Sequence, residues 1–148
     1  MCRGRDAVET GCRKSTNICD HPRYGRRDPL VSQEFAKAEH LADSSFKAIG
    51  ALSSVELGWF DWDVKKYQTA VKLKEQVELL SLIGDVALKD NEPQIHAHLV
   101  IGRRDGTAHG GHLMSATVRP TCEIVVTENP QHLQKEIDAE SGLALIRF

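Results

Sequence analysis

Apolar and polar residues alternate with a period of two in a series of short segments between residues 44 and 127. This is the period of a half-buried β-strand, because successive side chains point to opposite faces of a sheet. Turn-forming residues such as Ser53-Ser54, Asp61-Trp62-Asp63 and Asp105-Gly106 separate the segments. The predicted strands are Ser44–Leu52, Val55–Phe60, Tyr67–Leu73, Gln94–Gly102, Gly110–Val118 and Cys122–Thr127. We therefore expect a largely antiparallel sheet.

Two other segments are predicted to be short helices that flank this sheet. Over residues 31–41 the apolar positions fall at helical spacing. A second helix is predicted to begin at Asn129-Pro130, with Leu133 and Ile137 as its apolar positions. The run Val77–Leu88 is almost wholly apolar, and its pattern fits a buried strand pair as well as a helix. The predicted fold class is α+β, with a largely antiparallel β-sheet and flanking helices.

The first 29 residues differ from the rest of the chain in charge and composition. Residues 1–28 carry seven basic and four acidic residues, a net charge of +3, whereas the remaining 120 carry 12 and 17, a net charge of −5. Cys2, Cys12 and Cys19 lie here, without the close pairs of a thiolate zinc site. The segment has neither a helical nor a strand period. We predict a poorly ordered basic leader over residues 1–29 and one folded domain over residues 30–148.

The overall composition argues against several classes of protein. Across all 148 residues, 19 Lys and Arg are balanced by 21 Asp and Glu, so bulk charge does not indicate nucleic-acid binding. Aromatic residues make up only 5% of the chain, few for a protein that stacks single-stranded bases. The apolar runs are too short to span a membrane, and the N-terminus lacks the apolar core of a signal peptide. A cytoplasmic protein with reduced thiols is therefore expected.

Four of the seven histidines fall within residues 96–112. His96 and His98 are two residues apart in the predicted strand Gln94–Gly102, so both side chains lie on one face of it. Two imidazoles in this arrangement commonly begin a metal site, and a third from a neighbouring strand would complete a set of three ligands. His109 and His112, which follow the Asp105-Gly106 turn, are the candidates for the third.

The turn at Asp105-Gly106 decides between these two candidates. If these two residues alone form the turn, Leu113 lies opposite His98, and His112 lies on the wrong face of the sheet. His109 would then share the correct face with His98. However, it would be on the order of 13 Å from His98 at the usual rise of a strand, too far to share an ion.

A shift of one residue changes this outcome. A three-residue loop Arg104-Asp105-Gly106 with Gly106 in the left-handed conformation, or a bulge at Gly110-Gly111, produces that shift. His112 then lies directly opposite His98, with Cβ atoms roughly 5 Å apart. We favour this register and predict His96, His98 and His112 as metal ligands. His109 remains the alternative ligand, or a group that supports the ligands from outside.

Three histidine ligands would define the chemistry of the site. Neutral imidazole suits Zn²⁺, with Fe, Ni or Cu as alternatives. Three protein ligands leave a coordination position for water or substrate, as in catalytic zinc sites. Glu123, one predicted strand further on, is a candidate base near the ion or simply an exposed carboxylate. The alternative to a metal site is a group of polar histidines on a sheet.

Several short motifs occur in a fixed order along the chain: AIGALS at 48–53, GWFD at 58–61, ELLSLIG at 78–84, HAH at 96–98, DG at 105–106, GGHL at 110–113 and VRPTCE at 118–123. Over residues 31–128 this order resembles the plants-and-prokaryotes conserved (PPC) domain family, bacterial type. The resemblance implies an α/β fold with a largely antiparallel sheet and assembly as a homotrimer. Plant members of the family bind AT-rich DNA, and by analogy a DNA-binding role is implied for bacterial members.

The family's fold is also similar to that of acetolactate decarboxylase, whose zinc is held by three histidines that include an H-x-H pair. This similarity implies His96 and His98 as ligands and matches His112 to the G-G-H motif. Two features depart from the family pattern. The strand expected before the helix at 31–41 is not evident in residues 1–29. Arg3-Gly4-Arg5 is followed by Asp6, whereas the AT-hook of plant members has proline there.

Two functions follow as expectations. The first is a trimeric PPC-domain protein with a histidine metal site that acts as a DNA-binding or regulatory module. The net charge of −5 beyond residue 28 opposes phosphate binding by the core, so any such role falls to the basic leader. The alternative is a metal-dependent lyase or hydrolase acting on a small carbonyl compound. A purely structural metal or trimerisation domain is the third reading.

Overall fold

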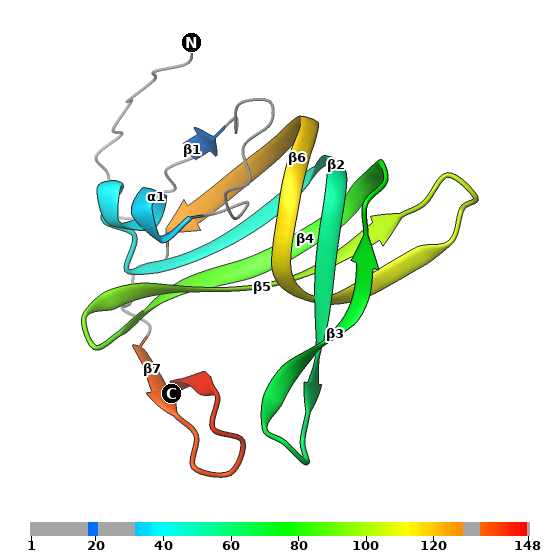
Figure 1. Ribbon diagram of the computed structural model, residues 1–148. Coiled ribbons are helices and arrows are strands. Elements are labelled where there is room, and N and C mark those ends of the chain that lie inside the picture. The colour runs from blue at the N-terminus through cyan, green and yellow to red at the C-terminus, as the bar shows by residue number, and fades with distance from the viewer. Residues whose placement is uncertain (1–17, 21–31, 129–133, 148) are drawn as a thin grey trace.

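The computed structural model describes residues 18–20, 32–128 and 134–147. Within these ranges the chain forms one helix and eight strands (Figure 1). In chain order they are β1 (Ile18–Asp20), α1 (Gln33–Ala38), β2 (Asp43–Asp61), β3 (Lys66–Leu73), β4 (Val77–Lys89), β5 (Glu92–Gly102), β6 (Ala108–Glu128), β7 (Gln134–Ile137) and β8 (Ala144–Arg147).

The described part of the protein is mostly β-sheet, so the predicted α+β class with flanking helices is wrong. Its only helix is α1, six residues long, within the segment predicted to be helical. The second predicted helix is wrong where it can be compared, because Gln134–Ile137 is strand β7, and residues 129–133 lie outside the described ranges. β7 pairs antiparallel with β8. This pairing supplies backbone hydrogen bonds that the spacing of two apolar residues does not reveal.

The central strands are longer than the predicted segments because turn-like residues within them form bulges. β2 continues through Ser53-Ser54, which were expected to be a turn. Its register with β6 shifts between Leu52 and Ser54, and the Ser54 hydroxyl donates to Thr117 Oγ1 at 3.0 Å. β6 likewise joins two predicted strands, and the apolar run Val77–Leu88 lies in the single strand β4. Such bulges bend a strand without ending it.

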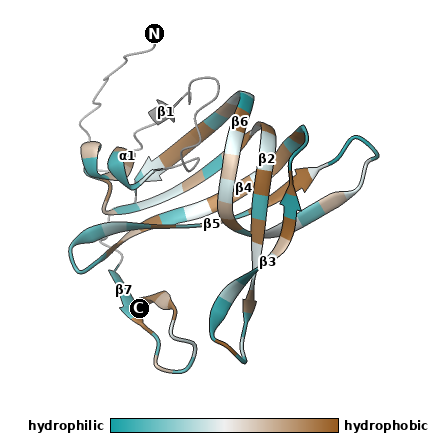
Figure 2. Ribbon diagram, in the orientation of Figure 1, coloured by the Kyte–Doolittle hydropathy of each residue, from teal (hydrophilic) through white to brown (hydrophobic). Residues whose placement is uncertain are grey.

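Four strands pair in a closed order and make the sheet curl back on itself. β2 pairs with β6, β6 with β5, β5 with β4, and β4 again with β2, all antiparallel. Figure 1 shows this curl, with the β2–β3 hairpin and the β7–β8 hairpin extending from it. Hydrophobic and hydrophilic residues alternate along β2 and β6 in Figure 2. Side chains that are fully buried between the strands include Leu52, Leu57, Leu82, Ile101 and Ile124.

The helix α1 closes one end of this core. Ser32 caps it, since its Oγ accepts the backbone N–H of Phe35 at 3.0 Å. Ala36, and Leu41 just beyond the helix, are buried against the sheet. The Gln33 side-chain amide donates to the Pro93 carbonyl at 3.2 Å and ties the helix to the start of β5. The helix thereby lies beside the strand that carries the H-x-H pair.

Most of the predicted leader lies outside the described residues, including Cys2, Cys12 and the Arg3–Asp6 motif. Its described part is β1, which pairs antiparallel with Ile124–Val126 of β6. Among the described residues, no helix has the length and apolar character needed to cross a membrane.

Candidate metal centre

The loop between β5 and β6 sets the register of the histidines. The backbone N–H of Arg103 donates to the Thr107 carbonyl at 2.8 Å, and that of Gly106 to the Arg103 carbonyl at 3.0 Å. Gly106 has φ of +82°, in the left-handed region. Asp105 Oδ1 accepts the Thr107 N–H at 3.0 Å and stiffens the loop. These contacts define the three-residue loop Arg104-Asp105-Gly106 that the sequence suggested.

The register that follows pairs His98 with His112 directly. The pairing of β5 with β6 continues without a shift through Gly110 and Gly111, so the loop alone produces this register. Gly111 has a different role, because a Cβ atom there would lie 2.8 Å from the Gly58 carbonyl oxygen of β2. The glycine allows β6 to pass close to β2 at the position next to His112.

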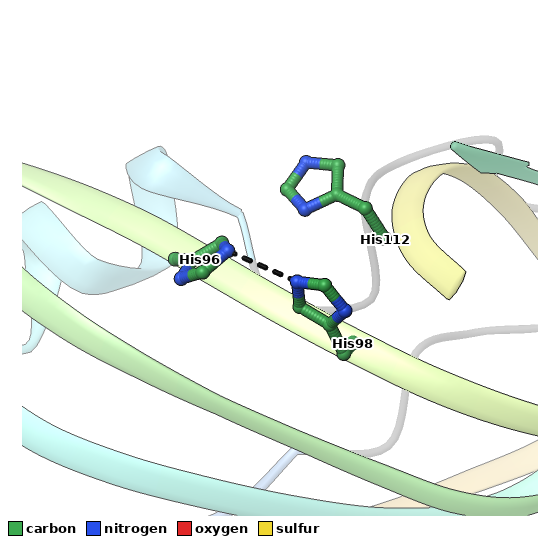
Figure 3. A group of neighbouring side chains, drawn as sticks. All are labelled: His96, His98 and His112. Carbon is green, nitrogen blue, oxygen red and sulfur yellow. Dashed lines mark hydrogen bonds between the residues drawn. The ribbon is translucent and has the colours of Figure 1, made fainter. Parts of the chain in front are cut away.

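His96, His98 and His112 converge on one point (Figure 3). The ring centroids of the three pairs are 5.0 to 5.2 Å apart, and the Nε2 atoms of His96 and His98 are separated by 3.2 Å. One nitrogen from each ring lies within 4.8 Å of the other two. The β5–β6 pairing thus places three imidazole nitrogens close enough together for a single ion.

The surroundings of the cluster oppose protonation of two of its imidazoles. Burial, reinforced by His96 and His98, lowers the pKa of His112 to about 4. Burial and the neighbouring His96 also lower the pKa of His98. Neutral imidazoles are the form that binds a metal. Nδ1 of His112 is buried and has no hydrogen-bond partner in the described part of the chain, which suits a group that has a metal ion nearby.

Three residues near the cluster were not predicted to be site residues from the sequence. The ring of Tyr67, on β3, stacks on that of His112 with centroids 3.9 Å apart. Asp85, on β4, lies opposite His96, and its Oδ2 is 3.6 Å from His96 Nδ1. Its Oδ1 is 2.5 Å from Nζ of Lys135, on β7. Burial raises the pKa of Asp85, but the contacts with His96 and Lys135 outweigh it and leave that pKa below its usual value.

A pocket of about 670 Å³ opens beside the cluster. His96, His112, Tyr67 and Lys135 contribute its polar wall, and the apolar wall includes Phe46, Leu113, Leu143 and Leu145. Residues of β8 and of the loop before it form one side of the pocket. The cluster therefore faces a space large enough for a small molecule.

The two other predicted site residues lie away from the cluster. His109 pairs with the buried Ile101, so it belongs to the opposite face of the β5–β6 hairpin from His98 and His112. Glu123 pairs with Ile49 and lines a separate pocket with Glu78 and Leu80. Of the predicted site residues, the structure therefore brings together His96, His98 and His112, and it joins neither His109 nor Glu123 to them.

Solved structures with a similar fold include a plant- and prokaryote-conserved protein from Pyrococcus horikoshii. It has 31% identity and a TM-score of 0.81 over 95% of this chain and 98% of that one. A metal-containing protein from Archaeoglobus fulgidus has 32% identity and a TM-score of 0.79 over 95% and 100%. A proposed DNA-binding protein from Ralstonia eutropha has 28% identity and a TM-score of 0.79 over 91% and 96%.

No curated protein matches the sequence. The model of the Plants and Prokaryotes Conserved domain matches residues 33–130, which include the helix α1, the strands β2 to β6 and the histidine cluster. The motif order, the fold and the two relatives above 30% identity agree with that match. The chain belongs to the Plants and Prokaryotes Conserved (PPC) domain family.

Proposed function

We propose that this protein is a PPC-domain module that binds one divalent transition-metal ion, Zn²⁺ foremost, through His96, His98 and His112. The convergence of these three imidazoles carries the proposal. Three protein ligands leave a coordination position for water or another ligand. The relative from Archaeoglobus fulgidus, described as metal-containing, supports the same assignment.

Metal analysis of the protein purified without added metal tests this proposal. We expect about one ion per wild-type chain and a large loss of metal in His96→Ala and His112→Ala. His109→Ala is the matched control, because it removes an imidazole from the opposite face of the same hairpin. After a chelator has removed the metal from the wild type, adding zinc at 100 times its dissociation constant should raise the free energy of unfolding by about 2.7 kcal/mol. Wild-type protein with neither metal nor zinc stabilisation would exclude the site.

A second candidate function is a metal-dependent lyase or hydrolase that acts on a small carbonyl compound. The pocket beside the cluster favours it, because a substrate there would reach the histidines. A bound divalent ion would polarise the carbonyl oxygen of such a substrate. Incubating zinc-loaded protein with short keto acids and esters, followed by proton NMR, tests the activity. Turnover that persists in His112→Ala, or none in the wild type, would count against it.

Association with DNA is the regulatory role that the family suggests, and the relative from Ralstonia eutropha is described as a proposed DNA-binding protein. In this chain residues 1–28 carry a net charge of +3 and the remaining residues −5, so the leader would make the phosphate contacts. Fluorescence anisotropy with an AT-rich duplex should show binding that weakens steeply with salt. Replacing Arg23, Arg26 and Arg27 by Ala should remove it, whereas Arg103→Ala should not. No binding by the wild type at low salt would reject this role.

We further propose a homotrimer, as the family resemblance implies. Large apolar side chains exposed near the cluster, Ile83 and Val100 among them, support an interface on that face.

A further inference from the structure

Asp85 is a carboxylate placed at the edge of the histidine cluster by strand register. In the pairing of β4 with β5, Asp85 lies directly opposite His96, so the two side chains share one face of the sheet. Oδ2 of Asp85 is 3.6 Å from Nδ1 of His96. This separation is longer than a hydrogen bond, and a side-chain shift of about half an ångström would bring it within range.

The two nitrogens of His96 have different neighbours. Nε2 faces the cluster, since it lies 3.2 Å from Nε2 of His98. Nδ1 faces the Asp85 carboxylate. A neutral imidazole carries its proton on one nitrogen only, and the partner of that nitrogen decides which one. A carboxylate beside Nδ1 favours the proton there and leaves the Nε2 lone pair directed at the other histidines.

Lys135 fixes the carboxylate in this position from the opposite side. Its Nζ is 2.5 Å from Asp85 Oδ1, and its side chain is only 3% exposed. A lysine buried to this extent requires a charged partner. β7, which carries Lys135, reaches the main sheet through a parallel pairing of Gln134 with Leu88 of β4, three residues beyond Asp85. The C-terminal hairpin thus delivers a cation to the carboxylate that faces His96.

We propose that Asp85 is a positioning residue of the metal centre: it accepts a hydrogen bond from the Nδ1–H of His96 and so presents Nε2 to the ion, while Lys135 holds the carboxylate in place. This inference rests on the proposed metal binding. Hydrogen bonds of this kind between a carboxylate and a histidine ligand fix the ring and raise its basicity. The chain would therefore contribute a third element, β4, and a fourth, β7, to a site whose ligands come from β5 and β6.

Removing Asp85 alone would leave Lys135 buried without a partner and could unfold the hairpin. The test therefore uses the background Lys135→Met, which keeps the aliphatic length and removes the charge. In this background Asp85→Asn is compared with Glu136→Gln. The second change neutralises a carboxylate that pairs with Arg147 in the same hairpin, away from the histidines. Both double variants, the single Lys135→Met variant and the wild type are studied as full-length chains.

Two measurements decide the question. Competition with a chromophoric chelator gives the zinc affinity, which should fall about 10- to 100-fold in Asp85→Asn/Lys135→Met relative to Lys135→Met. It should stay unchanged in Glu136→Gln/Lys135→Met. Nitrogen-15 NMR of the imidazole rings gives the tautomer. In the metal-free wild type, His96 should carry its proton on Nδ1. In metal-free Asp85→Asn/Lys135→Met it should lose that preference.

The outcomes separate this inference from the proposal of metal binding. Equal zinc affinities in the Asp85 and Glu136 double variants would overturn the positioning role while leaving the metal site standing. If the wild type bound no zinc, the metal site would fail, and the tautomer of His96 would still decide whether Asp85 orients the ring. An Nε2-protonated His96 in the chelated wild type would overturn the inference outright.

Discussion

His112 is the histidine of the cluster whose protonation is most strongly opposed. It is half-buried, its ring stacks on Tyr67, and both other imidazoles of the cluster lie beside it. Together these surroundings hold its pKa at about 4, against a usual value of 6.5. The folded protein therefore keeps His112 neutral over a range of pH in which an unfolded chain would protonate it.

A pH dependence of stability follows from this difference. Between pH 6.5 and 4 the unfolded state binds the proton and the native state does not, so the free energy of unfolding falls as the pH is lowered through this window. Because His112 is partly accessible to water, we expect a loss on the order of 1–2 kcal/mol. Urea unfolding of chelated wild type and His112→Gln at pH 7.5 and 4.5 measures it. Equal losses in both proteins would contradict the assignment.

At the scale of elements, the β5–β6 loop determines whether the histidines meet. Gly106 adopts φ of +82°, and a Cβ atom added there would meet no atom within 4 Å. The requirement for glycine is therefore conformational rather than steric. An alanine in the left-handed region costs about 1–2 kcal/mol, and asparagine costs less because it enters that region more readily.

We expect Gly106→Ala to lower the free energy of unfolding by about 1 kcal/mol and Gly106→Asn to lower it by less. Urea denaturation of the chelated proteins measures both changes. The zinc affinity of Gly106→Asn should match that of the wild type, since the register is kept. The matched control is the same pair of substitutions at Gly142, which has φ of +75° in the loop between β7 and β8, away from the β5–β6 loop. Equal destabilisation by Ala and Asn at position 106 would contradict the role of backbone conformation.

What the sequence predicts of this hairpin depends on local information. The period of two places His96 and His98 on one face, and the loop length then fixes His112 opposite His98. Every step involves residues that are near one another in the chain. The same local reasoning recovers strand β3 and the position of α1.

Features that depend on distant segments could not be predicted in this way. Asp85 reaches His96 only because β4 is a strand with a particular register, and the apolar run around Asp85 fits a helix equally well. The signal available in the sequence was that Asp85 is a charged residue in the middle of an apolar run. Lys135 lies in a segment whose strand pairs with β8 and β4, so its partner is set by tertiary contacts. The serines of β2 resemble a turn because bulges and turns use similar residues.

At the scale of the whole molecule, the face that carries the cluster is also apolar. Ile83 lies directly opposite His98 and is 67% exposed, and Val100 follows His98 by two residues on the same face. Ile49 and Leu80, both more than half exposed, line the separate pocket that also contains Glu123. Large aliphatic side chains grouped in this way are typical of a protein–protein interface. The proposed trimer would bring its subunits together here, beside the histidine cluster.

Ile83→Glu tests this arrangement without disturbing the core, because the side chain is mostly exposed. A glutamate in an apolar interface would lose its solvation and repel its symmetry copies, so the trimer should dissociate to monomers. Light scattering coupled to size exclusion measures the mass. Val64→Glu is the matched control, since Val64 is 51% exposed but lies in the turn between β2 and β3, and it should remain trimeric. Equal dissociation of both variants would place the interface elsewhere. A monomeric wild type would exclude the trimer.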